Sequence, residues 1–202
     1  NLAETGLFAA SAGMMGWLGT LSLAAHGIAM QLASVTFMVH IGLANATTVR
    51  AGQAFGLRDR ALLRSGAIAA ASLSGGFALF TVAIFLLFPE PLIGVFMSPN
   101  EPDRAGVMAI GVGLLAAAAL FQLTDAGQVM ALGLLRGVQD TKVPMVIAAI
   151  SYWIIGIPIS YILGITLGFG GVGIWLGLAI GLAVAAVLLS LRFWRWAGRW
   201  TP

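Results

Sequence analysis

Six long apolar runs constrain the fold of this chain more than any other feature of the sequence. An α-helix needs about 20 mainly apolar residues to cross the hydrocarbon core of a bilayer. Runs of this order occupy residues 2–21, 25–49, 62–88, 105–135, 143–167 and 172–191. Because a spanning segment must satisfy its own backbone polar groups, each run is predicted to be a transmembrane helix. The sequence therefore predicts an all-α integral membrane protein with six transmembrane helices.

The composition agrees with this class and excludes several others. Hydrophobic residues make up 60% of the 202 residues and charged residues only 8%, a balance outside the range of soluble domains. There is no cysteine, which excludes disulfides, thiolate metal sites and a cysteine nucleophile. The connections between runs are short, so residues 1–202 are expected to form a single transmembrane domain. The chain begins with Asn1 and no leader-like segment precedes the first run, so we expect it to be part of a longer protein.

The basic residues predict an orientation, because cytoplasmic loops of membrane proteins are enriched in Lys and Arg. Of the ten basic residues, only Arg104 lies on one side of the predicted bundle. The other nine lie on the opposite side: Arg50, Arg58, Arg60, Arg64, Arg136, Lys142, Arg192, Arg195 and Arg199. Both ends of the chain are therefore predicted to be cytoplasmic, with Trp194, Trp196 and Trp200 as anchors at the inner interface.

Asp125 is an acidic residue in the middle of the fourth run. It precedes the interfacial Arg136 by eleven positions (136 − 125), which places it roughly 16 Å deep, near the bilayer midplane. Ionisable residues at this depth are costly and usually functional. Phe121, Asp125 and Gln128 follow an i, i+4, i+7 spacing and share one helix face, which is predicted to point into the protein. The alternative is a structural carboxyl group that hydrogen-bonds a neighbouring helix.

Other polar residues fall within the first two runs. Glu4 lies about fifteen residues before the outer boundary, hence at a depth similar to that of Asp125. Two acids on different helices at one depth can share a cation or a proton. His40 is predicted at mid-membrane, either as a proton relay or as a hydrogen-bonding packing residue, and Gln31 either lines a cavity or joins helices. His26 is expected at the outer edge of its helix in a solvated or capping role.

No motif in the sequence indicates an enzymatic function. "GFGGVG" at residues 168–173 fits the dinucleotide-binding pattern, but it lies in a turn between membrane spans without a preceding strand. Gly173, Gly177 and Gly181 instead form a small-residue ladder typical of close helix packing. An intramembrane aspartyl protease would need a second aspartate at membrane depth. Nucleophile elbows, metal clusters and phosphate loops are absent from the sequence, which therefore predicts neither an enzyme nor a nucleic-acid-binding protein.

Two stretches resemble a known transporter family. "AAHGIAMQLASVTFMVHIGLANATTVRAGQAFG" and "DAGQVMALGLLRGVQDTKVPM" are similar to the second lobe of multidrug and toxic compound extrusion (MATE) transporters of the bacterial NorM-like branch. The resemblance implies twelve helices in two lobes of six, related by a pseudo-twofold axis along the membrane normal. The chain would be helices seven to twelve, in a multi-pass protein of the bacterial inner membrane. The N-terminal lobe of the same protein, or a second copy, would complete the transporter.

The resemblance also implies a function: export of cationic or amphipathic drug-like compounds in exchange for inward Na⁺ or H⁺, without another cofactor. The family's cation-binding glutamate and aspartate fall on Glu4 and Asp125, which would hold Na⁺ if that is the coupling ion. Three positions depart from the family pattern: Phe121 replaces a tyrosine, His40 a proline and Gly27 a glutamine. Loss of the tyrosine hydroxyl favours H⁺ over Na⁺.

Two other functions remain as alternatives. The first is a flippase for lipid-linked precursors from the wider superfamily, which would need basic residues inside its cavity to meet anionic head groups. All nine inner basic residues are predicted at interfaces instead, which argues against it. The second is a membrane module without transport activity, which assembles with a partner through its glycine faces and predicts no effect of Asp125 on any flux.

Overall fold

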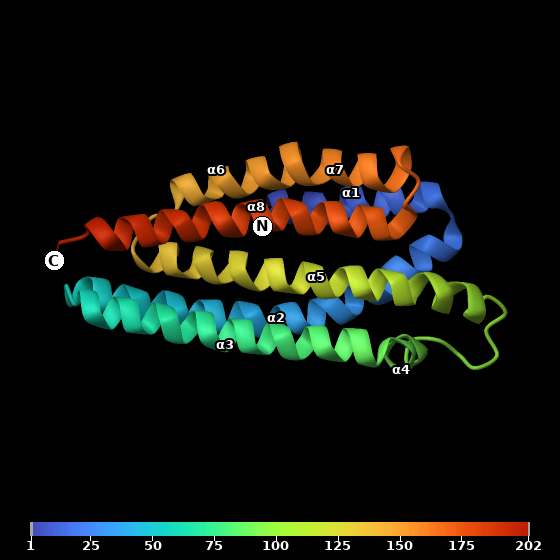
Figure 1. Ribbon diagram of the computed structural model, residues 1–202, viewed down its shortest axis with the longest axis horizontal. Coiled ribbons are helices and arrows are strands. Elements are labelled where there is room, and N and C mark those ends of the chain that lie inside the picture. The colour runs from blue at the N-terminus through green and yellow to red at the C-terminus, as the bar shows by residue number, and fades with distance from the viewer. Residues whose placement is uncertain (1, 202) are drawn as a thin grey trace.

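The computed structural model describes residues 2–201 and places them in a bundle of helices that extend along a common direction (Figure 1). The longest single helices are α1 (Leu2–Leu18), α2 (Thr20–Gly56), α3 (Arg60–Leu87), α5 (Arg104–Gly137) and α8 (Gly170–Arg199). A sixth segment is continuous but changes winding: α6 (Lys142–Ile150), the π-helix η1 (Ser151–Gly156), α7 (Ile157–Tyr161) and the π-helix η2 (Ile162–Thr166). The prediction of an all-α fold is confirmed, since the described residues contain no strand.

The predicted spans need two corrections. Five helical segments are long and apolar enough to cross a membrane, whereas α1 has 17 described residues and ends at Leu18 rather than at residue 21. The chain turns at Gly19, whose φ of 124° suits glycine, so α2 begins earlier than predicted. The connection after α3, predicted as a loop, contains the short helix α4 (Pro89–Gly94), which Pro89 starts at its first position.

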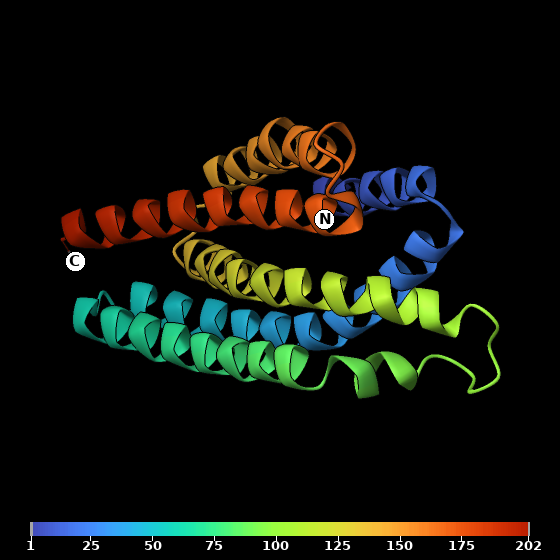
Figure 2. The same ribbon diagram turned by 45° about the vertical axis from the view of Figure 1, so that its right-hand side comes forward.

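Helices α5 and α8 form the centre of the bundle. Figures 1 and 2 show α8 between the Lys142–Thr166 segment and α5, with α2 and α3 on the other side of α5. In their most apolar stretches, 50% of α5 and 56% of α8 is buried, against 22% for each of the other three spans. Polar side chains on α5 are therefore enclosed by protein rather than by lipid.

The predicted glycine ladder on α8 is confirmed as a packing face. A Cβ atom at Gly173 would lie 2.6 Å from the backbone of Leu163, and one at Gly181 would lie 2.8 Å from the Cα atom of Gly156. At Gly177 a Cβ atom would overlap the backbone of Ser160. Without side chains at these positions, α8 can approach the Lys142–Thr166 segment closely, which is how membrane helices gain packing energy.

The segments rich in basic residues meet at one end of the bundle. Figure 1 shows the α2–α3 turn, the α5–α6 turn and the C-terminal end on the same side. At the α2–α3 turn, Oδ1 of Asp59 accepts a hydrogen bond of 2.8 Å from the backbone N–H of Leu62 and so caps α3. At the opposite end Arg104 donates to the carbonyl oxygens of Met97 and Ser98. The charge asymmetry predicted from the sequence is therefore a property of the folded bundle.

Candidate functional site

The predicted face of α5 points into the protein. Asp125 is 1% exposed, Gln128 2% and Phe121 3%. No described residue hydrogen-bonds to Oδ2 of Asp125. Buried polar atoms without a partner are costly in proteins, and a bound water or ion is one of the explanations for them. Asp125 therefore provides a free acceptor atom in the interior of the bundle.

A cavity of about 270 Å³ lies between α1, α2 and α5. Its lining residues are Glu4, Thr5, Phe8, Met30, Ala33, Ser34, Phe37 and Phe121. Glu4 is half-buried and is the only charged residue in this lining. Asp125 is on α5, one turn beyond Phe121. Glu4 thus lines the cavity, and Asp125 is buried on the same α5 face as Phe121, which lines the cavity too.

Tyr152 is a site residue that the sequence reasoning missed. Its hydroxyl group accepts a hydrogen bond from Nε2 of Gln128, and its side chain is buried. Oε1 of Gln128 has no partner among the described residues. A signal for Tyr152 was present, because it lies ten positions (152 − 142) after the interfacial Lys142. It therefore belongs at nearly the same depth as Asp125.

The neighbouring Trp153 fixes α1 beside this site. Its Nε1–H donates a hydrogen bond of 3.2 Å to the carbonyl oxygen of Ala3. Its ring lies directly over Gly6, where a Cβ atom would be 2.5 Å from the nearest ring carbon. Tyr152 and Trp153 both belong to η1, and π-helical turns of this kind occur frequently at functional sites. Segment η1 thus contacts α1, which carries Glu4, through Trp153. It contacts Gln128, on the same helix face as Asp125, through Tyr152.

An aromatic series links four helices around Phe121. The rings of Phe8 and Phe121 meet edge to face with centroids 6.0 Å apart, and those of Phe121 and Trp175 meet likewise at 5.3 Å. Trp175 is fully buried, and its Nε1–H donates a hydrogen bond of 3.1 Å to Nδ1 of His26. The prediction that His26 has a solvated or capping role is wrong, because the side chain is 4% exposed and packs against α8.

His40 and Gln31 lie away from the Glu4 cavity. His40 is buried, with Nδ1 3.2 Å from Oγ of Ser74 on α3, and its ring packs against Phe77. Helix α2 continues without interruption through His40, as expected where the proline typical of the family is absent. Gln31 is exposed on the surface of α2. Neither residue lines the cavity that contains Glu4.

The chemistry of this site suits a hard cation or a proton. Within residues 2–201 no group of three or more His, Asp or Glu side chains converges as a metal site. The buried oxygen atoms on this side of α5 belong instead to the carboxylate of Asp125, to the amide of Gln128 and to the Tyr152 hydroxyl that Gln128 contacts. Hard cations are bound by oxygen ligands of these kinds, and a proton needs the carboxylate alone.

These features describe a helical membrane module with a buried acidic site, and the comparisons identify its family. The MatE family model matches residues 1–162. Two proteins described as "Probable multidrug resistance protein NorM" are similar to the chain. One, from Rhizobium meliloti strain 1021, is 47% identical over 96% of this chain and 42% of its own length. The other, from Agrobacterium fabrum strain C58, is 46% identical over 95% and 41%. The chain belongs to the MatE family.

The fold agrees with this assignment. The crystal structure of a MATE protein in its straight conformation matches 98% of this chain with a TM-score of 0.86, at 19% sequence identity. The match covers 43% of that protein. The chain thus spans less than half the length of these relatives.

Proposed function

We propose that the chain is one lobe of a cation-coupled multidrug exporter in the bacterial inner membrane. The N-terminal lobe of the same protein, or a second copy of this one, would supply the other half of the substrate cavity. The ends of the chain would be cytoplasmic, as the nine basic residues at one end of the bundle suggest. The observation that carries the proposal is the buried Asp125, whose Oδ2 atom has no described partner, next to the cavity that contains Glu4.

The site can couple two fluxes if ion and substrate stabilise different conformations of the lobe. A cation or proton bound at Asp125 and Glu4 would remove the repulsion between the two carboxylates and favour the packing in which they are close. A cationic drug in the cavity would compete for the same negative charge. Exchange follows because each ligand has a different affinity for the two states. Phe121 lines the cavity one helical turn before Asp125 and would control access to the buried carboxylate.

The coupling ion is proposed to be H⁺ or Na⁺. Phe121 supplies no oxygen ligand, which favours H⁺. The Tyr152 hydroxyl and the free Oε1 atom of Gln128 provide oxygen ligands that would suit Na⁺. The relatives' names specify drug resistance and no ion.

The test measures ethidium efflux from cells or vesicles that contain the complete protein, under an imposed pH gradient or an imposed Na⁺ gradient. Asp125→Asn is expected to abolish gradient-driven efflux while insertion into the membrane is unchanged. Asp103→Asn is the matched control, because Asp103 precedes the same helix and its side chain makes no capping hydrogen bond. Gradient-driven efflux by Asp125→Asn at the wild-type rate would refute the assignment, and the effective gradient identifies the ion.

The alternative functions find less support. A flippase for lipid-linked anions would need basic side chains in its cavity, whereas the residues lining the Glu4 cavity include one acid and no base. A module that only assembles with a partner does not account for an unpartnered carboxylate oxygen in the bundle interior. The efflux experiment also separates these functions, since neither predicts that drug efflux depends on Asp125.

A further inference from the structure

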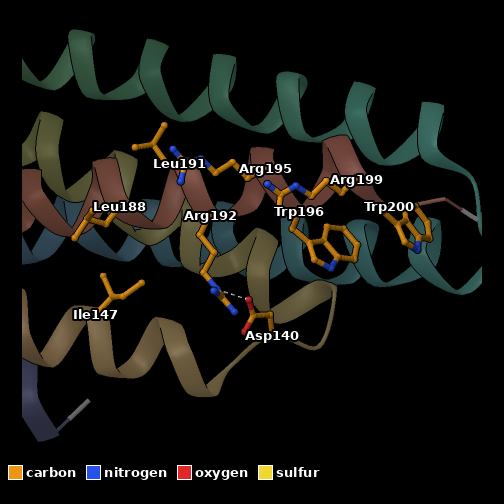
Figure 3. Close-up of a pocket in the computed structure, with 9 residues that line it drawn as sticks. All are labelled: Asp140, Ile147, Leu188, Leu191, Arg192, Arg195, Trp196, Arg199 and Trp200. Atoms are coloured by element: carbon orange, nitrogen blue, oxygen red, sulfur yellow. Dashed lines mark hydrogen bonds and ion pairs between the residues drawn. The ribbon is translucent and has the colours of Figure 1, made fainter.

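A second cavity, of about 500 Å³, lies at the C-terminal end of α8, far along the chain from the acidic site (Figure 3). It is formed by the last turns of α8, the α5–α6 turn and α6. Its lining residues are Asp140, Ile147, Leu188, Leu191, Arg192, Arg195, Trp196, Arg199 and Trp200. This C-terminal groove combines charged and apolar walls, and the proposed export mechanism uses none of its residues.

The charged wall is positive overall. Three arginines and one aspartate give a net charge of +2 (3 − 1). Nε of Arg192 is 2.6 Å from Oδ2 of Asp140, so these two charges neutralise each other (Figure 3). Arg195 and Arg199 are exposed, and neither makes an ion pair with a described residue. Their guanidinium groups are therefore available for an anion, and guanidinium geometry is well suited to the oxygens of a phosphate.

The other walls are apolar and aromatic. The rings of Trp196 and Trp200 stack with centroids 5.3 Å apart and an interplanar angle of 17°. Both pack against Phe55 at the end of α2, with centroid distances of 5.8 and 5.4 Å. Tryptophan side chains of this kind are typical of the membrane–water interface. Leu188 and Leu191 continue the apolar surface along α8 in the direction of the bilayer centre.

The end of α8 is held in place, so the groove has a fixed shape. Nη2 of Arg60, at the start of α3, donates a hydrogen bond of 3.0 Å to the carbonyl oxygen of Gly198. The backbone N–H of Trp200 donates to the carbonyl oxygen of Trp196 at 2.9 Å. The Arg60 bond thus connects the last turn of α8 to α3, and the Arg192–Asp140 pair connects the preceding turns to the α5–α6 turn.

We propose that the C-terminal groove binds an anionic phospholipid of the inner leaflet. Arg195 and Arg199 bind the phosphate of the head group, the Trp196–Trp200 pair lies at the level of the glycerol, and the acyl chains follow Ile147, Leu188 and Leu191. A soluble anion would use the arginines alone, whereas a lipid matches both the positive and the apolar walls. Basic pockets between helices on the cytoplasmic side are known to bind acidic head groups. The proposal depends on the membrane orientation but not on the ion site.

The test measures lipid binding to the complete protein by native mass spectrometry in detergent. Phosphatidylglycerol, phosphatidylcholine and inorganic phosphate are titrated separately. Wild type is expected to bind phosphatidylglycerol more tightly than the other two. Each arginine near an anionic lipid contributes about fivefold in affinity, so Arg195→Gln and Arg199→Gln should each weaken phosphatidylglycerol binding by about this factor, and the double variant by roughly 30-fold. Phosphatidylcholine binding should not change.

Arg64→Gln is the matched control. It removes one exposed positive charge from α3 at the same end of the bundle but outside the C-terminal groove, and its affinity for phosphatidylglycerol should equal that of wild type. An equal loss of affinity in Arg64→Gln would show that the general positive charge of this surface attracts the lipid, and would overturn the proposal. The proposal would also be overturned if the double variant bound phosphatidylglycerol as wild type does, or if inorganic phosphate bound as tightly as phosphatidylglycerol. The efflux result for Asp125→Asn bears only on the ion site, and the lipid-binding result bears only on the C-terminal groove, so each proposal can be refuted without the other.

Discussion

The Nε1–H group of Trp175 donates a hydrogen bond of 3.1 Å to Nδ1 of His26 and so joins α8 to α2 in the interior of the bundle. The same indole ring packs against Phe121, the residue that lines the Glu4 cavity and precedes Asp125 by one turn. The Trp175–His26 hydrogen bond therefore helps to hold the ring of Phe121 in place beside the acidic site.

Replacing Trp175 with Phe removes the donor and leaves Nδ1 of His26 buried without a partner. A buried acceptor left unpaired costs about 1–3 kcal/mol of stability. We expect Trp175→Phe to lower the thermal unfolding temperature of the protein in detergent. His26→Leu should remove most of this penalty in the double variant, because both polar partners are then absent. Additive effects of the two substitutions would show that the hydrogen bond does not contribute to stability.

The Tyr152 hydroxyl is predicted to contribute to ion binding. Tyr152→Phe removes the partner of the Gln128 amide and with it one candidate oxygen ligand. If Na⁺ drives transport, the Na⁺ concentration for half-maximal efflux should rise about tenfold, the usual effect of losing one hydrogen bond to a charged group. Tyr161→Phe is the control, because this tyrosine is exposed at the end of α7 and does not line the Glu4 cavity. If both variants needed the same Na⁺ concentration for half-maximal efflux, Tyr152 would not be part of the ion site.

Phe121→Tyr is the complementary change. Phe121 lines the cavity together with Glu4, so a hydroxyl on its ring adds an oxygen ligand at the position where the family pattern has a tyrosine. Efflux driven by a Na⁺ gradient is expected to increase relative to efflux driven by a pH gradient. The ratio of the two rates, measured in the same vesicles, tests this directly. An unchanged ratio would mean that the ion site does not extend to this side chain.

Much of the fold was predictable because transmembrane helices are defined by length and hydropathy alone. The five long spans, the glycine ladder on α8 and the inward face of α5 follow from apolar run length and from helical periodicity. The turn at Gly19 was not predictable in the same way. It falls inside a nearly continuous apolar stretch, and its signal was a single glycine among 27.

The site was only partly predictable. Asp125 and Glu4 could be singled out as candidates because carboxylates are rare and costly at membrane depth. Tyr152 and Trp175 are amphipathic residues that occur in any membrane helix, and only the packing of η1 and α8 against α5 gives them their positions. His26 was misplaced for the same reason: its burial depends on a partner 149 residues away in the sequence.

The packing of α8 can be tested at a glycine that has no free space. A Cβ atom at Gly177 would overlap backbone atoms of Ser160, and backbone cannot move aside as a flexible side chain can. Gly177→Ala is therefore expected to destabilise the protein by about 1–3 kcal/mol, the usual cost of overpacking. Gly42→Ala is the control, because Gly42 is exposed on α2 with no atom within 4 Å of the added Cβ. There the better helix propensity of alanine should raise stability by up to about 1 kcal/mol. Thermal unfolding in detergent measures both changes, and a stabilising Gly177→Ala would contradict the close packing of α8 against α7.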